Sequence, residues 1–192
     1  MSGLSSTPLA ISDVLLLQPK KFSDHRGYFL ETFSHREFLR AGIKCNFVQD
    51  NQSLSVRRGT IRGLHVQLPP HAQAKLIRVL KGAIFDVAVD LRHRSPTFGR
   101  WCGATISAEN HNQLFVPRGF AHAFCTLDSN TEVAYKVDDY YASECEAGVI
   151  WNDPILDIDW PVAPGEVVVS DKDSRLPRFS TFESPFVYGE QL

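Results

Sequence analysis

Between residues 47 and 141, apolar and polar residues alternate mostly with a period of two, the pattern of β-strands with one buried face. Residues that favour turns separate the runs. Residues 59–82, bounded by glycines at predicted turns, are predicted to form two strands on the wall of a small β-barrel. Further strands are predicted at 47–53, 83–91, 101–106, 114–116, 123–127 and 132–135. Many short strands at regular spacing are typical of a sandwich or a closed barrel, so we expect a mainly β fold.

One pair of strands has a clear predicted connection. Residues 76–80 and 83–91 flank the turn sequence Lys81-Gly82, which predicts a β-hairpin. Alternation places four large apolar residues on one face of the second strand: Phe85, Val87, Val89 and Leu91.

The segments outside this region are less regular. Residues 1–10 are small and polar, and we expect them to be frayed. Residues 14–17 predict a short strand, and residues 28–33 alternate again. A capping-box sequence at 34–37 predicts a short helix that stops at Gly42.

The end of the chain is rich in proline and turns. We therefore expect one domain over residues 1–192, with a barrel core at about 45–142 and extended arms at 1–44 and 143–192.

Composition narrows the function classes. Of the 192 residues, 43% are hydrophobic and 22% charged, ordinary values for a globular protein, and the net charge of −2 argues against nucleic-acid binding. The four cysteines form no C-x-x-C motif, so free thiols are expected. No signal peptide or bilayer-spanning run is evident, and we expect a cytoplasmic protein without a membrane partner.

The chemistry-bearing residues begin with His65, Gln67 and Lys75, and a second motif, Pro117-x-Gly119-x-x-His122, follows. Together they resemble the two motifs of the cupin family, whose barrels hold a metal on three histidines and a glutamate. Gln67 and Lys75 stand at or near two of those ligand positions, and lysine is a poor metal ligand. The remaining pair, His65 and His122, is too few for a catalytic metal, so no metal or other cofactor is expected.

Without a metal, the same residues suit proton abstraction beside a carbonyl group. Imidazole titrates near neutrality and can act as a base, while an ammonium can stabilise the oxygen of an enolate. His65 taken alone is as readily explained as a hydrogen-bonded core residue. Burying Arg62, Gln67, Lys75 and His122 beside it for packing alone would be costly, which favours a site.

Several further motifs occur in register with one family. They are Arg62-Gly-Leu-His65-x-Gln67, Gln73-x-Lys75-Leu, Phe85-Asp-Val-Ala-Val-Asp90, Arg92-x-x-Ser95-Pro-Thr-Phe-Gly99, Pro117-x-Gly119-Phe-Ala-His122, Tyr135-Lys136, Asp139-Tyr140-Tyr141, Trp151-Asn-Asp-Pro154 and Asp159-Trp160-Pro161. Over about residues 14–177 the chain resembles the dTDP-4-dehydrorhamnose 3,5-epimerases. The resemblance implies a cupin-type double-stranded β-helix (jelly-roll) barrel. It also implies cofactor-free epimerisation at C3 and C5 of dTDP-4-dehydro-6-deoxy-D-glucose, within dTDP-L-rhamnose biosynthesis.

The resemblance also implies catalytic roles. His65 corresponds to the general base, and Asp171 to the carboxylate paired with it. Tyr135 corresponds to the acid that returns a proton from the opposite face. Lys75 corresponds to the cation that stabilises the enolate, and His122 lies in the same pocket.

The nucleotide end of the substrate is matched as well. Arg26 and Arg62 correspond to diphosphate-binding residues, and guanidinium groups suit phosphate oxygens. The other substrate contacts implied by the family are Phe29, Glu31, Gln49, Asn51, Glu146 and Lys172. In the family, some of these come from the partner subunit of a homodimer through exchanged N-terminal strands.

Three alternatives remain open at this stage. The chain could epimerise a single carbon, C3 or C5, of a related dTDP-4-ketosugar. It could be a metal-dependent cupin oxygenase, or a nucleotide-sugar binding module without activity. Val66 and Thr126, which depart from the common residues at their positions, leave the proton carriers in place and bear only on substrate detail.

Overall fold

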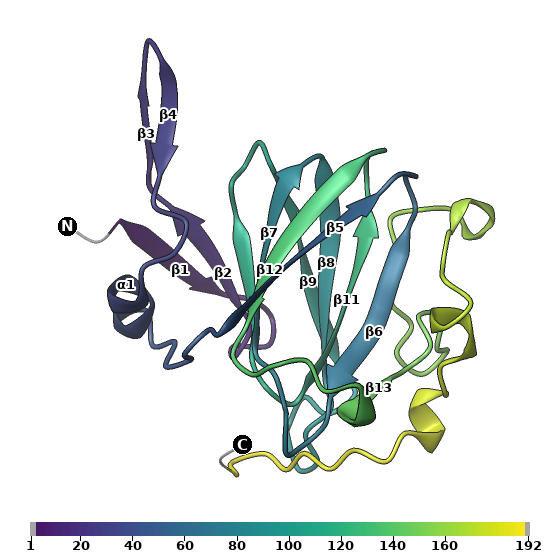
Figure 1. Ribbon diagram of the computed structural model, residues 1–192. Coiled ribbons are helices and arrows are strands. Elements are labelled where there is room, and N and C mark those ends of the chain that lie inside the picture. The colour runs from purple at the N-terminus through teal and green to yellow at the C-terminus, as the bar shows by residue number, and fades with distance from the viewer. Residues whose placement is uncertain (1–2, 191–192) are drawn as a thin grey trace.

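Two antiparallel sheets form the body of the protein in a computed structural model that describes residues 3–190 (Figure 1). The six-stranded sheet has the order β1-β2-β10-β7-β12-β5, and the five-stranded sheet the order β13-β6-β11-β8-β9. The strands are β1 (Leu4–Pro8), β2 (Leu15–Pro19), β3 (Lys21–Asp24), β4 (Gly27–Leu30), β5 (Gln49–Ser55), β6 (Ile61–Gln67), β7 (Lys75–Lys81), β8 (Ala83–Asp90), β9 (Trp101–Ser107), β10 (Gln113–Val116), β11 (Phe120–Thr126), β12 (Thr131–Val137) and β13 (Glu146–Gly148).

The predicted hairpin at Lys81-Gly82 is wrong. β7 pairs with β10 and β12 in one sheet, whereas β8 pairs with β11 and β9 in the other. Gly82 turns the chain with a φ of 77°, in the region that glycine tolerates, and carries it across the barrel to the second sheet. Alternation in sequence determines which residues share a face but not which strand lies alongside, so it could not exclude this crossover.

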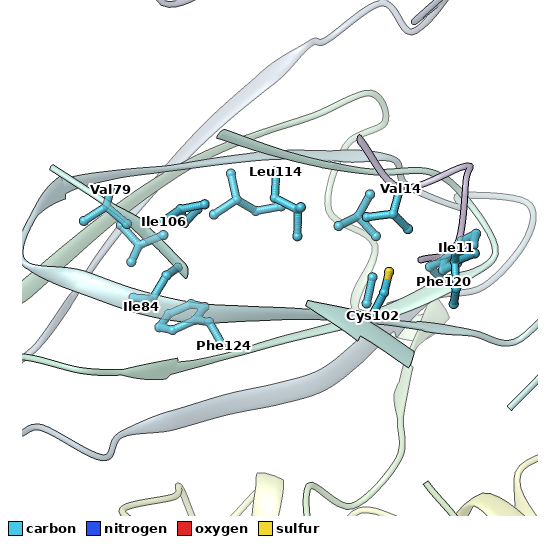
Figure 2. Packing of buried hydrophobic residues seen from close by; sticks show 13 residues of the cluster. Ile11, Val14, Val79, Ile84, Cys102, Ile106, Leu114, Phe120 and Phe124 are labelled. Carbon is cyan, nitrogen blue, oxygen red and sulfur yellow. The ribbon is translucent and has the colours of Figure 1, made fainter. Parts of the chain in front are cut away.

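Apolar side chains from the two sheets meet in a core that fills one part of the interior (Figure 2). Val79 and Leu114 come from the six-stranded sheet, and Ile84 and Phe124 from the five-stranded sheet. Each of these side chains is less than a tenth exposed. The cluster holds the sheets face to face and thereby sets the spacing of residues that project inward elsewhere.

The outer face of the five-stranded sheet is covered by the C-terminal arm, drawn in green and yellow beside β6 and β13 (Figure 1). The predicted apolar face of β8 packs here against Val149, Leu156 and Phe186. The arm contains short 3₁₀ turns: η1 (Ser143–Cys145), η2 (Pro164–Glu166), η3 (Asp173–Arg175) and η4 (Phe179–Thr181). It is anchored to the barrel near the start of β6 by a parallel bridge between Thr60 and Val168.

The N-terminal arm is more ordered than predicted. Residues 4–8 form β1, an edge strand paired with β2, so the expected frayed end is wrong for these residues, while residues 1–2 lie outside the described part. Polar edge strands carry no periodic apolar signal, which explains the error. The predicted helix is confirmed as α1 (His35–Arg40), although the N-cap side chain of Ser34 makes no capping hydrogen bond.

β3 and β4 form a separate two-stranded hairpin that projects from the body (Figure 1). Its aromatic side chains are largely exposed: Phe22 at 52%, Tyr28 at 58% and Phe29 at 67%. All four cysteines are free thiols, as expected. Among residues 3–190, no helix has the length and apolar character needed to cross a bilayer.

Candidate active site

Inward side chains from both sheets surround a cavity of about 540 Å³. His65 on β6 and His122 on β11 line it from the five-stranded sheet, and Lys75 on β7 and Tyr135 on β12 line it from the six-stranded sheet. A smaller lobe of about 130 Å³ shares His65, Lys75 and Tyr135. Gln49 and Asn51 from β5, two of the substrate contacts that the resemblance implied, line this lobe.

The carboxylate partner of His65 is Asp173, and the predicted pairing with Asp171 is wrong. His65 Nε2 lies 2.7 Å from Asp173 Oδ1. Asp171 lies at the surface with its side chain 97% exposed, near Arg175. The first residue of η3 is Asp173, and the turn directs its side chain toward β6, where the backbone N–H of Gly63 donates to Oδ2 at 3.3 Å.

The Asp173 carboxylate determines which nitrogen of His65 can act as a base. Burial alone raises the pKa of Asp173, but hydrogen bonds from His65 and Gly63 outweigh it and the pKa is lowered. A carboxylate only accepts hydrogen bonds, so Nε2–H of His65 donates to Asp173, and in the neutral imidazole Nδ1 is the nitrogen with the free lone pair. This is the arrangement in which an acid residue orients a histidine base and stabilises its protonated form.

Lys75 places a cation inside the barrel. Burial lowers the pKa of its ammonium to about 8, and the negative charges of Asp86 and Glu146 oppose this shift. The group is therefore charged at neutral pH but close to its titration. A charged ammonium in poorly solvated surroundings is suited to stabilise a developing oxyanion.

Tyr135 faces the same cavity from the opposite sheet to His65. Burial raises its pKa, with nearby Glu146 adding to the shift and Arg62 opposing it. The phenol therefore stays protonated at neutral pH and can donate. The imidazole of His65 and the phenol of Tyr135 thus occupy opposite walls of one cavity.

His122 belongs to a second histidine–carboxylate pair. Its Nε2 lies 2.6 Å from Oδ1 of Asp86, which projects inward from β8. Burial lowers the pKa of His122, although the neighbouring Asp86 carboxylate opposes the shift. The imidazole is therefore neutral at physiological pH.

A polar network borders the mouth of the cavity. Glu146 accepts hydrogen bonds from Tyr141 at 2.8 Å and from Lys172 at 2.5 Å. Arg62 is held by the hydroxyl of Ser55 and the carbonyl of Leu54, both at 3.1 Å. The predicted residues Arg62, Glu146 and Lys172 therefore line the same cavity as His65, Lys75 and Tyr135.

Three predicted substrate residues lie elsewhere. Arg26 is at the tip of the β3–β4 hairpin, 78% exposed and paired with Asp24. Phe29 lies in the same hairpin, and Glu31 follows it. None of the three lines the cavity of its own chain.

Sequence reasoning missed three residues of the site. Asp86 could have been found, because the apolar face assigned to β8 leaves it on the opposite, inward face. Tyr141 lay within a motif without an assigned role, and its contact with Glu146 depends on the loop. Asp173 could not be distinguished from Asp171 by pattern, because loops have no fixed periodicity.

No group of three or more histidine, cysteine, aspartate or glutamate side chains within residues 3–190 is arranged to hold a metal ion. Gln67, at the position of a cupin ligand, instead uses its amide to bind the backbone of Tyr140 at 2.9 Å and Ala142 at 2.9 Å. Its role here is to hold the loop after β12.

Comparison with known proteins identifies the family. The profile of dTDP-4-dehydrorhamnose 3,5-epimerase matches residues 8–181. The chain belongs to the dTDP-4-dehydrorhamnose 3,5-epimerase family. A curated member from Shigella flexneri is 49% identical over 170 residues, which cover 88% of this chain and 92% of the relative.

Solved structures of the epimerase family agree with this fold. The Bacillus anthracis enzyme with bound TDP and PPi is 50% identical, with a TM-score of 0.88 over 91% of this chain and 99% of the other. The Legionella pneumophila enzyme in complex with dTDP-4-keto-L-rhamnose is 41% identical, with a TM-score of 0.89 over 94% and 95%. The predicted mainly β, cupin-type jelly-roll fold is confirmed.

Proposed function

We propose that this epimerase-family chain converts dTDP-4-dehydro-6-deoxy-D-glucose to dTDP-4-dehydro-L-rhamnose by inverting C3 and C5. The observation that carries the proposal is the placement of His65 and Tyr135 on opposite sheets around one cavity. Inversion of a carbon needs a base on one face of the intermediate and an acid on the other.

The first step is proton removal next to the C4 ketone. His65 takes the proton on Nδ1 and becomes an imidazolium, which the Asp173 carboxylate 2.7 Å away stabilises. The electron pair of the broken C–H bond moves to the ketone oxygen and forms an enolate. Lys75 supplies the positive charge for that oxygen.

The second step returns a proton from the other side. Tyr135 donates its phenolic proton to the same carbon while the enolate collapses to the ketone. The raised pKa of this tyrosine keeps the proton available at neutral pH. Exchange with solvent then removes the proton from His65 and returns one to Tyr135. The same steps at the second carbon complete the reaction without a redox cofactor.

The nucleotide is proposed to bind at the mouth of the cavity. Arg62 suits the diphosphate, while Gln49 and Asn51 offer amide groups to the sugar and base. Lys172 and Glu146 complete this side.

We further propose a homodimer in which the N-terminal hairpin completes the partner's site. Support comes from the projecting β3–β4 hairpin, with its exposed aromatics and Arg26, which lies outside the cavity of its own chain (Figure 1). Exposed apolar surface of this kind marks a contact site.

Solvent exchange tests the reaction. Chelator-treated protein should incorporate deuterium from D₂O at both C3 and C5 of the substrate, and His65→Ala should abolish incorporation. Exchange at one carbon would indicate a single-carbon epimerase. Unchanged exchange in His65→Ala would remove this residue from the mechanism, and loss of wild-type activity on chelation would favour a metal enzyme.

Subunit mixing tests the dimer. His65→Ala and Arg26→Ala are each expected to be nearly inactive alone. In a mixed dimer, one site combines an intact His65 with the partner subunit's Arg26, so random mixing should restore about a quarter of the sites. No recovery after verified mixing would contradict the exchange.

A further inference from the structure

Asp86 is a buried carboxylate that the proposed reaction does not use. Its side chain is fully buried. One oxygen, Oδ1, accepts from His122 at 2.6 Å, while Oδ2 is buried and has no hydrogen-bond partner among the described residues. A buried carboxylate with a hydrogen bond to only one of its oxygens raises the free energy of the folded state, unless a positive charge nearby compensates it.

The strand geometry directs Asp86 and Lys75 into the same interior. Ile84 flanks Asp86 on the inward face of β8, and Ile77 follows Lys75 on the inward face of β7. Ile84 and Ile77 pack in one core cluster between the sheets. Because side chains alternate along a strand, Asp86 and Lys75 project into the same interior from opposite walls.

Electrostatics agrees with this geometry. Asp86 is the larger of two negative influences that raise the pKa of Lys75 against the lowering caused by burial, and Glu146 is the other. The charges of both groups also act on the pKa of His122, which Asp86 raises and Lys75 lowers. The other titratable or charged groups that line the cavity around Lys75 are His65, His122, Tyr135, Glu146, Arg62, Lys172 and Asp173.

We propose that Asp86 is a positioning residue that keeps the Lys75 ammonium charged and directed into the cavity, with His122 as the neutral donor that holds the carboxylate in place. Asp86 thus acts through Lys75 and does not touch the substrate. Only the stabilisation of the enolate by the charged lysine rests on the proposed function. Its protonation can be measured without substrate.

The test measures the titration of Lys75 directly. Protein labelled with ¹³C at lysine Cε is titrated by NMR, and the Lys75 signal is assigned by its absence in Lys75→Met. Asp86→Asn should lower the Lys75 pKa by about one unit or more, because a stabilising negative charge is lost. Asp128→Asn, which removes an exposed carboxylate outside the cavity, is the matched control and should leave it unchanged.

Activity provides a second readout. In Asp86→Asn, the alkaline limb of kcat/KM should move to lower pH by the same amount as the NMR titration, and Asp86→Glu should partly restore it. In a Lys75→Met background, Asp86→Asn should cause no further loss of solvent exchange. A merely structural residue would lower activity equally at every pH.

Each outcome decides the inference. An unchanged Lys75 titration in folded Asp86→Asn would overturn it, even if epimerase activity were confirmed. A lowered titration in protein that lacks epimerase activity would uphold the electrostatic link and refute only the proposed function. If Asp86→Asn does not fold, Asp86→Ser, which is neutral and still accepts from His122, takes its place.

Discussion

The buried ammonium of Lys75 destabilises the folded protein, so a substitution that removes its charge should increase stability. Its pKa falls from 10.5 to about 8 in the folded protein. At about 1.4 kcal/mol per pKa unit, the charged ammonium destabilises the fold by about 3 kcal/mol at neutral pH. Lys75→Met keeps most of the length of the side chain and removes the charge, so it should raise the free energy of unfolding by up to this amount.

The pH dependence distinguishes this effect from ordinary packing. Below the folded pKa of about 8, Lys75 is protonated in both states and the full cost is present. Between that value and 10.5, the unfolded state binds the proton and the folded state does not, so the wild type gains stability as pH rises. The difference between the wild type and Lys75→Met should therefore be largest at pH 7 and mostly lost at about pH 10.

Urea unfolding at both pH values measures the difference. Thermal unfolding gives a second measure, because for a chain of this size about 3 kcal/mol corresponds to a rise in Tm of roughly 6–12 °C. Lys81→Met is the matched control, because Lys81 ends the same strand but is exposed, and it should change stability little. If Lys75→Met were less stable than the wild type, or its advantage were independent of pH, the account of Lys75 would be refuted.

Three further predictions concern activity. Asp173→Asn should lower kcat roughly 100- to 10,000-fold by disturbing the His65 tautomer, whereas Asp171→Asn should have little effect. If steady-state assays showed the larger loss for Asp171→Asn, Asp171 would be the functional partner of His65. Tyr135→Phe should retain deuterium exchange within about tenfold while losing inverted product by NMR, and equal loss of both would contradict its place opposite the base. The kcat/KM profile should fall as pH rises through about 8, where Lys75 loses its proton in the free enzyme, and a flat alkaline profile would argue against a catalytic cation.

Alternating polarity was sufficient to predict the β-rich class and the burial of individual faces. The predicted apolar face of β8 is present and packs beneath the C-terminal arm. These predictions succeed because a strand places neighbouring side chains on opposite faces whatever its partners are. They fail for strand pairing, which is why the crossover at Gly82 was mistaken for a hairpin.

Loop geometry limits prediction of the site itself. Asp171 and Asp173 stand two residues apart in a segment without periodicity, and only the turn at η3 places one beside His65 and the other in solvent. The N-terminal residues present a different limit. Arg26 was predicted as part of the site, but it lies on a projecting hairpin away from the cavity of its own chain. Whether such a hairpin contributes to its own site or to that of a second copy depends on how the chains assemble, which local sequence patterns do not show.

The apolar cluster between the two sheets explains how the site can hold its charges in place. Ile77 and Ile84 belong to this cluster, and Lys75 and Asp86 lie beside them on the inward faces of the same two strands. Because protein cores are close-packed, the apolar cluster resists compression and keeps the polar residues beside it from collapsing together. Inversion through an intermediate needs a base on one wall and an acid on the other, held at a constant distance. A barrel whose opposite walls are joined by one apolar cluster meets that need, whereas neighbouring strands of a single sheet would place the base and the acid on the same side.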